Sequence, residues 1–170
     1  MKTIIIFLII TICAASSIAQ IRHVPGVKSV DVVYGVSGHG TVMGAYFVSY
    51  WRPNLYMKTG AFLENGNESG ISYQSIGADF KVARTLLKKS PVFYLNGTAG
   101  VMLSVDKTTA GDEFFKIDQA FKYGPLAGIE MELFITDAIV LVTSFDQRFL
   151  IGTEFGNFRW FANAGLRFNF

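Results

Sequence analysis

The chain has 170 residues, with 15 Lys or Arg against 13 Asp or Glu, and 51% of its residues are hydrophobic. A net charge so close to zero gives no electrostatic reason to expect nucleic acid as a partner, and we expect no direct nucleic-acid binding. Aromatic residues make up 15% of the chain and occur with 17 glycines and four prolines, a composition that favours strands and tight turns over helices.

The first 19 residues differ from the rest of the chain. Lys2 precedes an apolar run over residues 4–12, and small residues then lead to Ser17-Ile18-Ala19 before Gln20. This run is too short for a membrane-spanning helix, which needs about 20 apolar residues, and it fits a secretory signal peptide with an A-x-A-like cleavage site. We therefore expect residues 1–19 to be removed and the mature chain to begin at Gln20.

The only cysteine, Cys13, lies within this segment, so the expected mature chain has none. A lipoprotein signal would place a small residue before the cysteine, and Ile12 is not small. Disulfides, thiol chemistry and cysteine metal sites are therefore excluded. Removing Lys2 from the 15 basic residues leaves 14 against 13 acidic ones. The mature length, about 150 residues, is that of one domain.

A lead-in segment over residues 20–28 contains the turn signal Pro25-Gly26. After it, eight segments alternate apolar and polar residues with period two, which places successive side chains on opposite faces of a strand. These segments cover residues 29–37, 41–51, 55–64, 71–84, 92–105, 121–135, 138–149 and 158–170. The pattern predicts a single all-β domain over residues 29–170, built from eight antiparallel strands.

The connections between these segments differ in length. Three are short turns, at residues 52–54, 87–91 and 136–137; four are mostly longer and polar, at residues 38–40, 65–70, 106–120 and 151–157. Short and longer links in strict alternation are typical of an up-and-down outer-membrane barrel with periplasmic turns and extracellular loops. After Gln20 no segment approaches 20 uninterrupted apolar residues, so this chain could span a membrane only as a closed barrel.

The alternation also separates charged from apolar faces. When the more apolar face of each strand is assigned to lipid, Arg84, at a strand end, is the one charge on that face. The opposite face carries six acidic and six basic residues: Asp31, Lys58, Glu64, Asp79, Lys81, Lys122, Glu130, Glu132, Asp146, Arg148, Arg159 and Arg167. An eight-stranded barrel has an interior that side chains can fill, so we expect paired charges rather than an ion-selective pore. A gated conduit remains the alternative.

Within this interior we single out one charge network, made of Glu130, Glu132, Asp146, Arg148 and Arg167. Glu130 and Glu132 lie two positions apart on one face and look superficially like a catalytic carboxylate pair. Arg148 and Arg167 follow on the next two strands, and we expect them to neutralise the two glutamates.

Aromatic residues are expected at both membrane interfaces. Tyr50, Trp51 and Tyr56 flank a short turn, whereas Phe149, Phe155, Phe158 and Trp160 flank a long loop, positions that suit two aromatic girdles. The last strand must pair with the first to close the barrel. Its lipid face carries Trp160, Leu166, Phe168 and Phe170, and this aromatic end resembles the C-terminal signal that outer-membrane assembly machinery reads.

Other candidate sites favour structural interpretations. His39 lies near Ser37 but has no acidic residue nearby in sequence, and His23, in the lead-in segment, is a weaker candidate base. The acidic residues Asp106, Asp112, Glu113 and Asp118 lack the spacing of a calcium loop. Asn67-Glu68-Ser69 and Asn96-Gly97-Thr98 match a glycosylation pattern that is common by chance. We expect no catalytic, cofactor or metal site, and no enzymatic activity.

The C-terminal third contains less generic motifs. Tyr123-Gly124-Pro125-Leu126-Ala127-Gly128-Ile129-Glu130-Met131-Glu132, Thr136-Asp137, Gln147-Arg148-Phe149-Leu150, Gly152, Gly156-Asn157-Phe158 and Gly165-Leu166-Arg167-Phe168 resemble the conjugative transposon protein TraO family of Bacteroidetes. The segment from Gln20 to Gly26 resembles the mature N-terminus of the same family, so the resemblance covers most of the mature chain. It implies an envelope component of a DNA-transfer apparatus, with other conjugation proteins as partners and with no catalytic residues.

Two functions therefore compete most directly. The first is a structural outer-membrane barrel in a conjugative, type IV secretion-like DNA-transfer apparatus, in contact with outer-membrane lipid and inserted by the assembly machinery. The second is a small porin-like or adhesive outer-membrane barrel unrelated to conjugation. A lipid-modifying enzyme and a soluble lipocalin-like binder are further alternatives, and the second of these would need its charges outside and its apolar residues inside.

Overall fold

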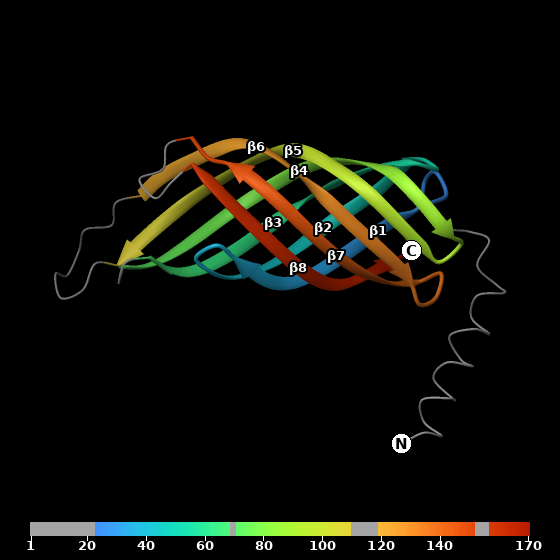
Figure 1. The fold of residues 1–170 in the computed structure, drawn as a ribbon, viewed down its shortest axis with the longest axis horizontal. Coiled ribbons are helices and arrows are strands. Elements are labelled where there is room, and N and C mark those ends of the chain that lie inside the picture. Colours follow the sequence, from blue (N-terminus) through green and yellow to red (C-terminus); the bar gives the residue numbers. More distant parts are fainter. Residues whose placement is uncertain (1–22, 69–70, 110–118, 152–156) are drawn as a thin grey trace, which may run out of the picture.

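A computed structural model describes residues 23–68, 71–109, 119–151 and 157–170. It contains a closed barrel in which each of eight strands pairs with its neighbours in chain order (Figure 1). The strands are β1 (Lys28–Ser37), β2 (Gly40–Arg52), β3 (Leu55–Glu68), β4 (Ile71–Ser90), β5 (Phe93–Thr109), β6 (Gln119–Phe134), β7 (Ile139–Phe149) and β8 (Phe158–Asn169). The predicted eight-stranded antiparallel barrel is confirmed.

Strand β8 closes the barrel against β1. The two strands pair in antiparallel register from Ser29 opposite Asn169 to Ser37 opposite Phe161. At the end of this seam the Phe170 amide donates to the Lys28 carbonyl at 2.9 Å. Closure leaves no sheet edge with unpaired backbone groups, which a barrel surrounded by lipid requires.

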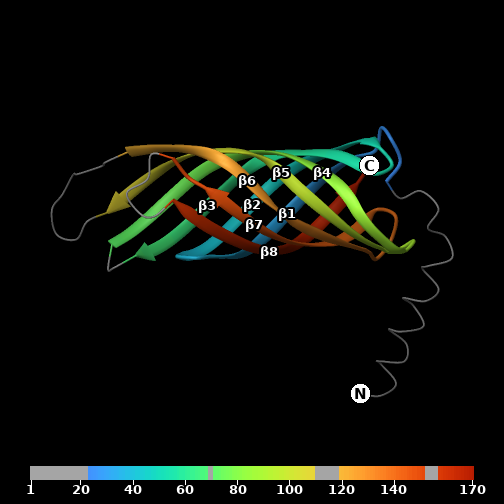
Figure 2. The same cartoon turned by 45° about the horizontal axis from the view of Figure 1, so that its top comes forward.

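The two ends of the barrel differ. The strands run obliquely to its long axis, and the C-terminus lies at the end where β2–β3, β4–β5 and β6–β7 are joined (Figures 1 and 2). We call this the turn end. The opposite end, where β1–β2, β3–β4, β5–β6 and β7–β8 are joined, is the loop end.

Several strands extend beyond their predicted limits. The predicted turn at residues 87–91 is wrong, because β4 continues to Ser90 with two register shifts against β5. The predicted loop at residues 106–120 is also too long, since β5 runs to Thr109 and β6 begins at Gln119. The physical reason is that barrel strands continue past the apolar belt, where polar side chains occupy strand positions and resemble a turn or loop in the sequence.

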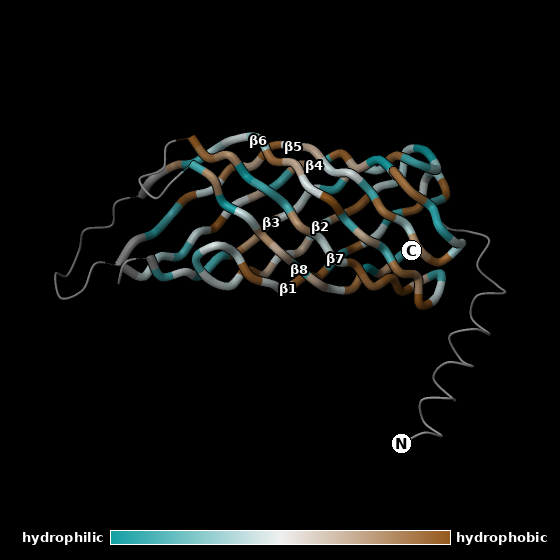
Figure 3. Tube along the Cα trace, in the orientation of Figure 1, coloured by the Kyte–Doolittle hydropathy of each residue, from teal (hydrophilic) through white to brown (hydrophobic). Residues whose placement is uncertain are grey.

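Outside and inside faces alternate along each strand, as Figure 3 shows by the succession of hydrophobic and hydrophilic positions. Large apolar side chains such as Val32, Ile76 and Val101 are more than half exposed on the outer surface. The exposed charges of the described strands lie near the strand ends, except for Arg84. The predicted position of Arg84 at a strand end is wrong, because β4 continues to Ser90, but Arg84 lies directly opposite Leu55, the first residue of β3. No helix among the described residues is long and apolar enough to cross a membrane.

Candidate functional site

The barrel interior holds a large set of buried charged side chains. Among the described residues, seven are acidic and six are basic: Asp31, Glu64, Asp79, Asp106, Glu130, Glu132, Asp146, Lys58, Lys81, Lys122, Arg148, Arg159 and Arg167. Each occupies an inward position in the alternation of its strand, and apolar clusters such as the one around Phe62 and Phe161 pack between them. The charges form three groups along the barrel.

The group nearest the turn end centres on Arg167. Its guanidinium contacts three carboxylates: Asp31 at 2.6 and 2.9 Å, Glu130 at 2.6 Å and Glu132 at 2.6 Å. Lys58 adds a second cation, 2.7 Å from Asp31 and 2.8 Å from Glu130. Five charges from strands β1, β3, β6 and β8 are therefore joined across the lumen, and each is bonded to at least one opposite charge.

His23 completes this group from the lead-in segment. Its Nε2 lies 2.6 Å from Glu132 Oε2 and its Nδ1 lies 3.1 Å from the Pro53 carbonyl oxygen. The ring stacks on Tyr94 with centroids 4.1 Å apart and is buried at the turn end. Both ring nitrogens lie at hydrogen-bond distance from oxygen atoms, so the ring links Glu132 to the turn between β2 and β3.

The sequence indicated His23 only as a weak candidate base and did not indicate its partner, because Glu132 lies 109 residues away in the chain. The local backbone places it: His23 has φ of 58° and Gly26 has φ of 90°, so the segment turns back on itself before β1. The Gly26 amide then donates to the Tyr50 carbonyl at 2.8 Å. A histidine beside a Pro-Gly turn was the available signal, and it does not specify a partner.

The middle group pairs Arg148 with Asp79. Their closest contact is 2.9 Å, and the guanidinium carbon lies 3.7 Å from the ring centroid of Phe161. Beside this pair, Lys81 forms an ion pair with Asp146. These contacts join β4 to β7 across the barrel.

The expectation that Arg148 neutralises Glu130 and Glu132 is therefore wrong. Arg148 lies opposite Leu126 on β6, whereas Glu130 lies opposite Ser144, which is four residues before Arg148 on β7. Four residues of a strand span about 13 Å. The carboxylates and Arg148 consequently lie at different levels of the lumen, and only Arg167 of the two arginines reaches them.

The group nearest the loop end centres on Glu64. Arg159 donates to Glu64 at 2.9 Å, and the Ser37 and Tyr73 hydroxyls donate to the same carboxylate at 2.5 and 2.9 Å. Lys122 forms an ion pair with Asp106, so the predicted loop position of Asp106 is wrong. Continuing the period-two pattern of this segment by one residue past Val105 would have placed Asp106 on the inward face.

The structure also shows the contacts of the other residues that the sequence suggested as nucleophile, glycosylation or metal sites. The Ser37 hydroxyl donates to Glu64 and accepts the Gly40 amide at 3.0 Å, so it stabilises the β1–β2 turn. Asn96 is buried and donates to Glu132 at 3.0 Å, which makes it inaccessible to glycosylation. No group of three or more His, Cys, Asp or Glu suited to a metal ion occurs in the described part of the chain. Asp112, Glu113, Asp118, Phe155 and Ser69 lie outside the described residues.

The predicted aromatic girdles are partly wrong. Tyr50 and Tyr56 are buried inside the barrel, because the Tyr50 hydroxyl accepts from Arg167 at 2.8 Å and the Tyr56 hydroxyl donates to Glu130 at 2.6 Å. Trp51, at the turn end, is 52% exposed on the outer surface. Phe149 and Phe158 are exposed at the loop end. Trp160, Leu166, Phe168 and Phe170 all face outward along β8.

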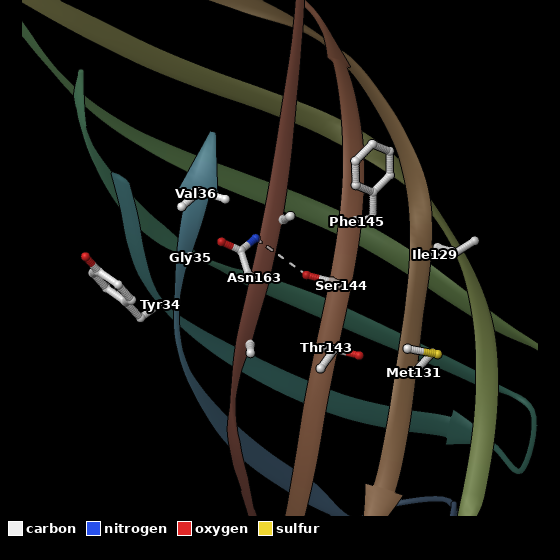
Figure 4. Close-up of a pocket in the computed structure, with 11 residues that line it drawn as sticks. Tyr34, Gly35, Val36, Ile129, Met131, Thr143, Ser144, Phe145 and Asn163 are labelled. Carbon is white, nitrogen blue, oxygen red and sulfur yellow. Dashed lines mark hydrogen bonds between the residues drawn. The ribbon is translucent and has the colours of Figure 1, made fainter. Parts of the chain in front are cut away.

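One apolar hollow of about 420 Å³ lies on the outer surface across β1, β8, β7 and β6 (Figure 4). Tyr34 and Val36 line it on β1, and Ile129 and Phe145 line it on the other side. The Asn163 carboxamide reaches Ser144 at 3.5 Å on the lumen side of the same wall. Because the hollow is apolar and opens outward, we expect hydrocarbon chains to fill it.

Solved structures resemble this fold. The N-terminal β-barrel domain of Pseudomonas aeruginosa OprF has a TM-score of 0.68 and 11% identity, and the match covers 86% of this chain and 98% of that domain. Neisserial surface protein A (NspA) has a TM-score of 0.58 and 12% identity, with 85% of this chain and 96% of NspA covered. Ail of Yersinia pestis, in complex with the heparin analogue sucrose octasulfate, has a TM-score of 0.53 and 12% identity, with 85% and 100% covered. The barrel is thus of the outer-membrane type.

Sequence comparison with curated proteins finds no match. A family model described as conjugative transposon protein TraO matches residues 61–170, from the middle of β3 to the end of the chain. This range is well over half of the 170 residues and includes the Arg167, Glu130 and Glu132 network. The chain therefore belongs to the conjugative transposon protein TraO family.

Proposed function

We propose that this protein is a structural outer-membrane component of the DNA-transfer apparatus encoded by conjugative transposons. It reaches the outer membrane after removal of residues 1–19, and its turn end faces the periplasm while its loop end faces outward. Its partners are outer-membrane lipid, the machinery that assembles it, and other conjugation proteins that contact its rims.

The observation that carries this proposal is membership of a family named for conjugative transposons, in a chain that forms a barrel with a packed, charge-paired interior. Buried cations and carboxylates that bond across the lumen make the wall rigid and occupy the path that a solute would need. A rigid, filled barrel supports function as an anchored part of an assembly, through surfaces that it presents at its two ends.

We propose no enzymatic role. The Ser37 hydroxyl, the candidate nucleophile beside His39, donates its proton to Glu64, so the hydroxyl is engaged in a buried hydrogen bond. Glu130 and Glu132, the candidate carboxylate pair, are both bonded to Arg167. Both carboxylates are therefore engaged in structural contacts inside the barrel.

We also propose that the outward face of β8, with Trp160, Leu166, Phe168 and Phe170, is the signal for the assembly machinery. Deleting Phe170 should reduce the amount of barrel inserted in cells. It should not reduce folding of the purified protein in detergent to the same extent. An equal loss of inserted barrel in cells and of folded barrel in detergent would mean that Phe170 acts through barrel stability alone.

Gene deletion in the donor tests the main proposal. Transfer of the element should fall to background while growth stays normal, and the wild-type gene supplied in trans should restore transfer. A His39→Ala gene should restore it equally, because no reaction depends on that residue. Unchanged transfer in the deletion strain would overturn the proposal.

The porin-like or adhesive alternative has its own measurements. The purified barrel in a planar bilayer should show no steady conductance, because paired side chains fill its interior. A steady single-channel current would instead support a porin. Normal transfer together with lost attachment of the deletion strain to surfaces would support an adhesin.

A further inference from the structure

A row of polar side chains crosses the outer wall of the barrel near the loop end. Thr41 on β2 lies opposite Asn65 on β3, Asn65 lies opposite Gln74 on β4, and Gln74 lies opposite Lys107 on β5. All four side chains are exposed on the outward face. Cross-strand neighbours on one face lie about 5 Å apart, so the four form a continuous polar row.

This row lies in a groove of about 710 Å³ that His39, Asn67 and Ser72 also line. The volume is within the range of pockets that hold small organic ligands, about 300–1,000 Å³. The groove is at the side of the barrel, because its central residues point outward from the wall and not along the axis. A ligand in it would therefore approach from the membrane leaflet around the barrel.

The amides in the groove are oriented by hydrogen bonds. Gln74 Nε2 donates to Asn65 Oδ1 at 3.0 Å, and Asn67 Nδ2 donates to Ser72 Oγ at 3.3 Å. The first bond does not use the NH₂ group of Asn65 or the carbonyl oxygen of Gln74. A donor and an acceptor side by side match sugar hydroxyls, each of which both donates and accepts.

Lys107 adds a positive charge at one end of the row. No hydrogen bond or ion pair engages its ammonium group within the ranges that the structure describes, and its nearest charged neighbour along β5, Asp106, faces inward and pairs with Lys122. An ammonium group is a compact donor that binds phosphate well. Hydroxyl-binding amides beside a phosphate-binding cation suit a phosphorylated sugar.

The height of the groove relative to the apolar belt favours a lipid. Directly below the row, two residues nearer mid-barrel, the outward positions are Met43, Leu63, Ile76 and Val105, and these four are again direct cross-strand neighbours. Two residues span about 7 Å along a strand. A molecule with its polar head in the groove would therefore have its hydrocarbon chains against this apolar row.

We propose that this groove binds the phosphorylated sugar headgroup of a glycolipid in the outer leaflet, with Lys107 on the phosphate and Asn65 and Gln74 on the sugar. This inference rests on the proposed outer-membrane orientation and not on a role in conjugation. Such a site would hold the barrel at a defined depth and rotation relative to its lipid neighbours.

Binding is tested with the purified full barrel in lauryldimethylamine oxide micelles, which contain neither phosphate nor sugar. Diphosphoryl lipid A is the probe, and native mass spectrometry measures the bound fraction over a concentration series. Lys107→Ala should weaken binding about tenfold or more, as expected for loss of a charge-assisted hydrogen bond. Lys107→Arg should retain most of the affinity, and Asn65→Ala with Gln74→Ala should weaken it without changing the charge.

Lys89→Ala is the matched control, because Lys89 is an exposed lysine at the turn end. It should bind lipid A like the wild type, and circular dichroism should show equal strand content in all variants. An equal loss in Lys89→Ala and Lys107→Ala, or no loss in either, would overturn the proposal.

A second arm distinguishes a lipid from a free sugar phosphate or free phosphate. Glucosamine 6-phosphate and inorganic phosphate should compete at least tenfold more weakly than lipid A, because they lack chains for the apolar row. Competition by either one at equal affinity would overturn the lipid assignment. Transfer frequency is measured separately, so a barrel that transfers normally without binding lipid A would refute this inference and leave the proposed function intact.

Discussion

Replacing Arg167 by methionine is the sharpest test of the ionic interior. Arg167 is fully buried and its guanidinium contacts Asp31, Glu130 and Glu132. Methionine fills a similar volume but removes the charge, so Lys58 would remain as the cation for Asp31 and Glu130, and Glu132 would keep its hydrogen bonds to His23 and Asn96. Removing one partner of a buried ion pair costs about 3–5 kcal/mol, and we expect a loss of unfolding free energy in this range.

The assay is reversible urea unfolding of the purified barrel in lipid vesicles, followed by tryptophan fluorescence. Arg52→Met is the matched control, because Arg52 is exposed at the turn end, and we expect it to change the unfolding free energy by less than about 0.5 kcal/mol. Adding Glu132→Gln to Arg167→Met should recover part of the loss, since one uncompensated carboxylate is removed. A loss below about 1 kcal/mol for Arg167→Met would show that the buried network does not stabilise the barrel.

Three further changes test the wall and the turn end. Val101→Arg places a cation on the lipid face at the middle of β5, where Val101 is 55% exposed, and should cost about 2–4 kcal/mol of unfolding free energy in vesicles. His23→Ala removes a buried hydrogen-bond partner of Glu132 and should lower the unfolding free energy by about 1–3 kcal/mol while speeding proteolysis of the lead-in segment. Gly60→Ala would place a methyl group 2.1 Å from the Ala45 carbonyl oxygen and should cost about 1–3 kcal/mol in the same titration.

Each change has a control that would expose a wrong explanation. Leu55→Arg, at the turn end, should cost no more than about 1 kcal/mol, because the lipid penalty falls with distance from the midplane. His39→Ala should leave stability unchanged. At Gly97 an added methyl group meets only the Leu86 side chain, at 3.1 Å, so Gly97→Ala should be milder than Gly60→Ala. Equal effects within any of these pairs would contradict the corresponding explanation.

The strand pattern was readable from sequence because lipid and lumen impose opposite demands on alternate residues. The segment from Phe93 to Val105, for example, has apolar or small side chains at every second position, and the structure places these on the outer face of β5. Strand ends were harder to locate. Lys88 and Lys89 look like a turn in sequence, yet they continue β4 because polar side chains are acceptable beyond the apolar belt.

Partners across the lumen were not readable from sequence. Arg148 was expected beside Glu130 because the two residues lie on neighbouring strands, but the register places them about 13 Å apart along the strand. Tyr50 and Tyr56 were expected at the membrane interface because they are aromatic, but their inward parity gives their hydroxyls to Arg167 and Glu130. The partner of His23 could not be predicted either, since its contact with Glu132 depends on how the lead-in segment turns.

The amino-acid sequence was enough to predict an eight-stranded barrel with apolar side chains outside and charges inside, and its motifs pointed to the family. Those properties depend on the spacing of residue types along the chain, which a two-residue period makes visible. The three-dimensional fold was needed to show which charges bond to one another, that His23 is buried at the turn end, and that Thr41, Asn65, Gln74 and Lys107 form one row. These depend on strand register and barrel closure, because both bring together residues that are far apart in the chain.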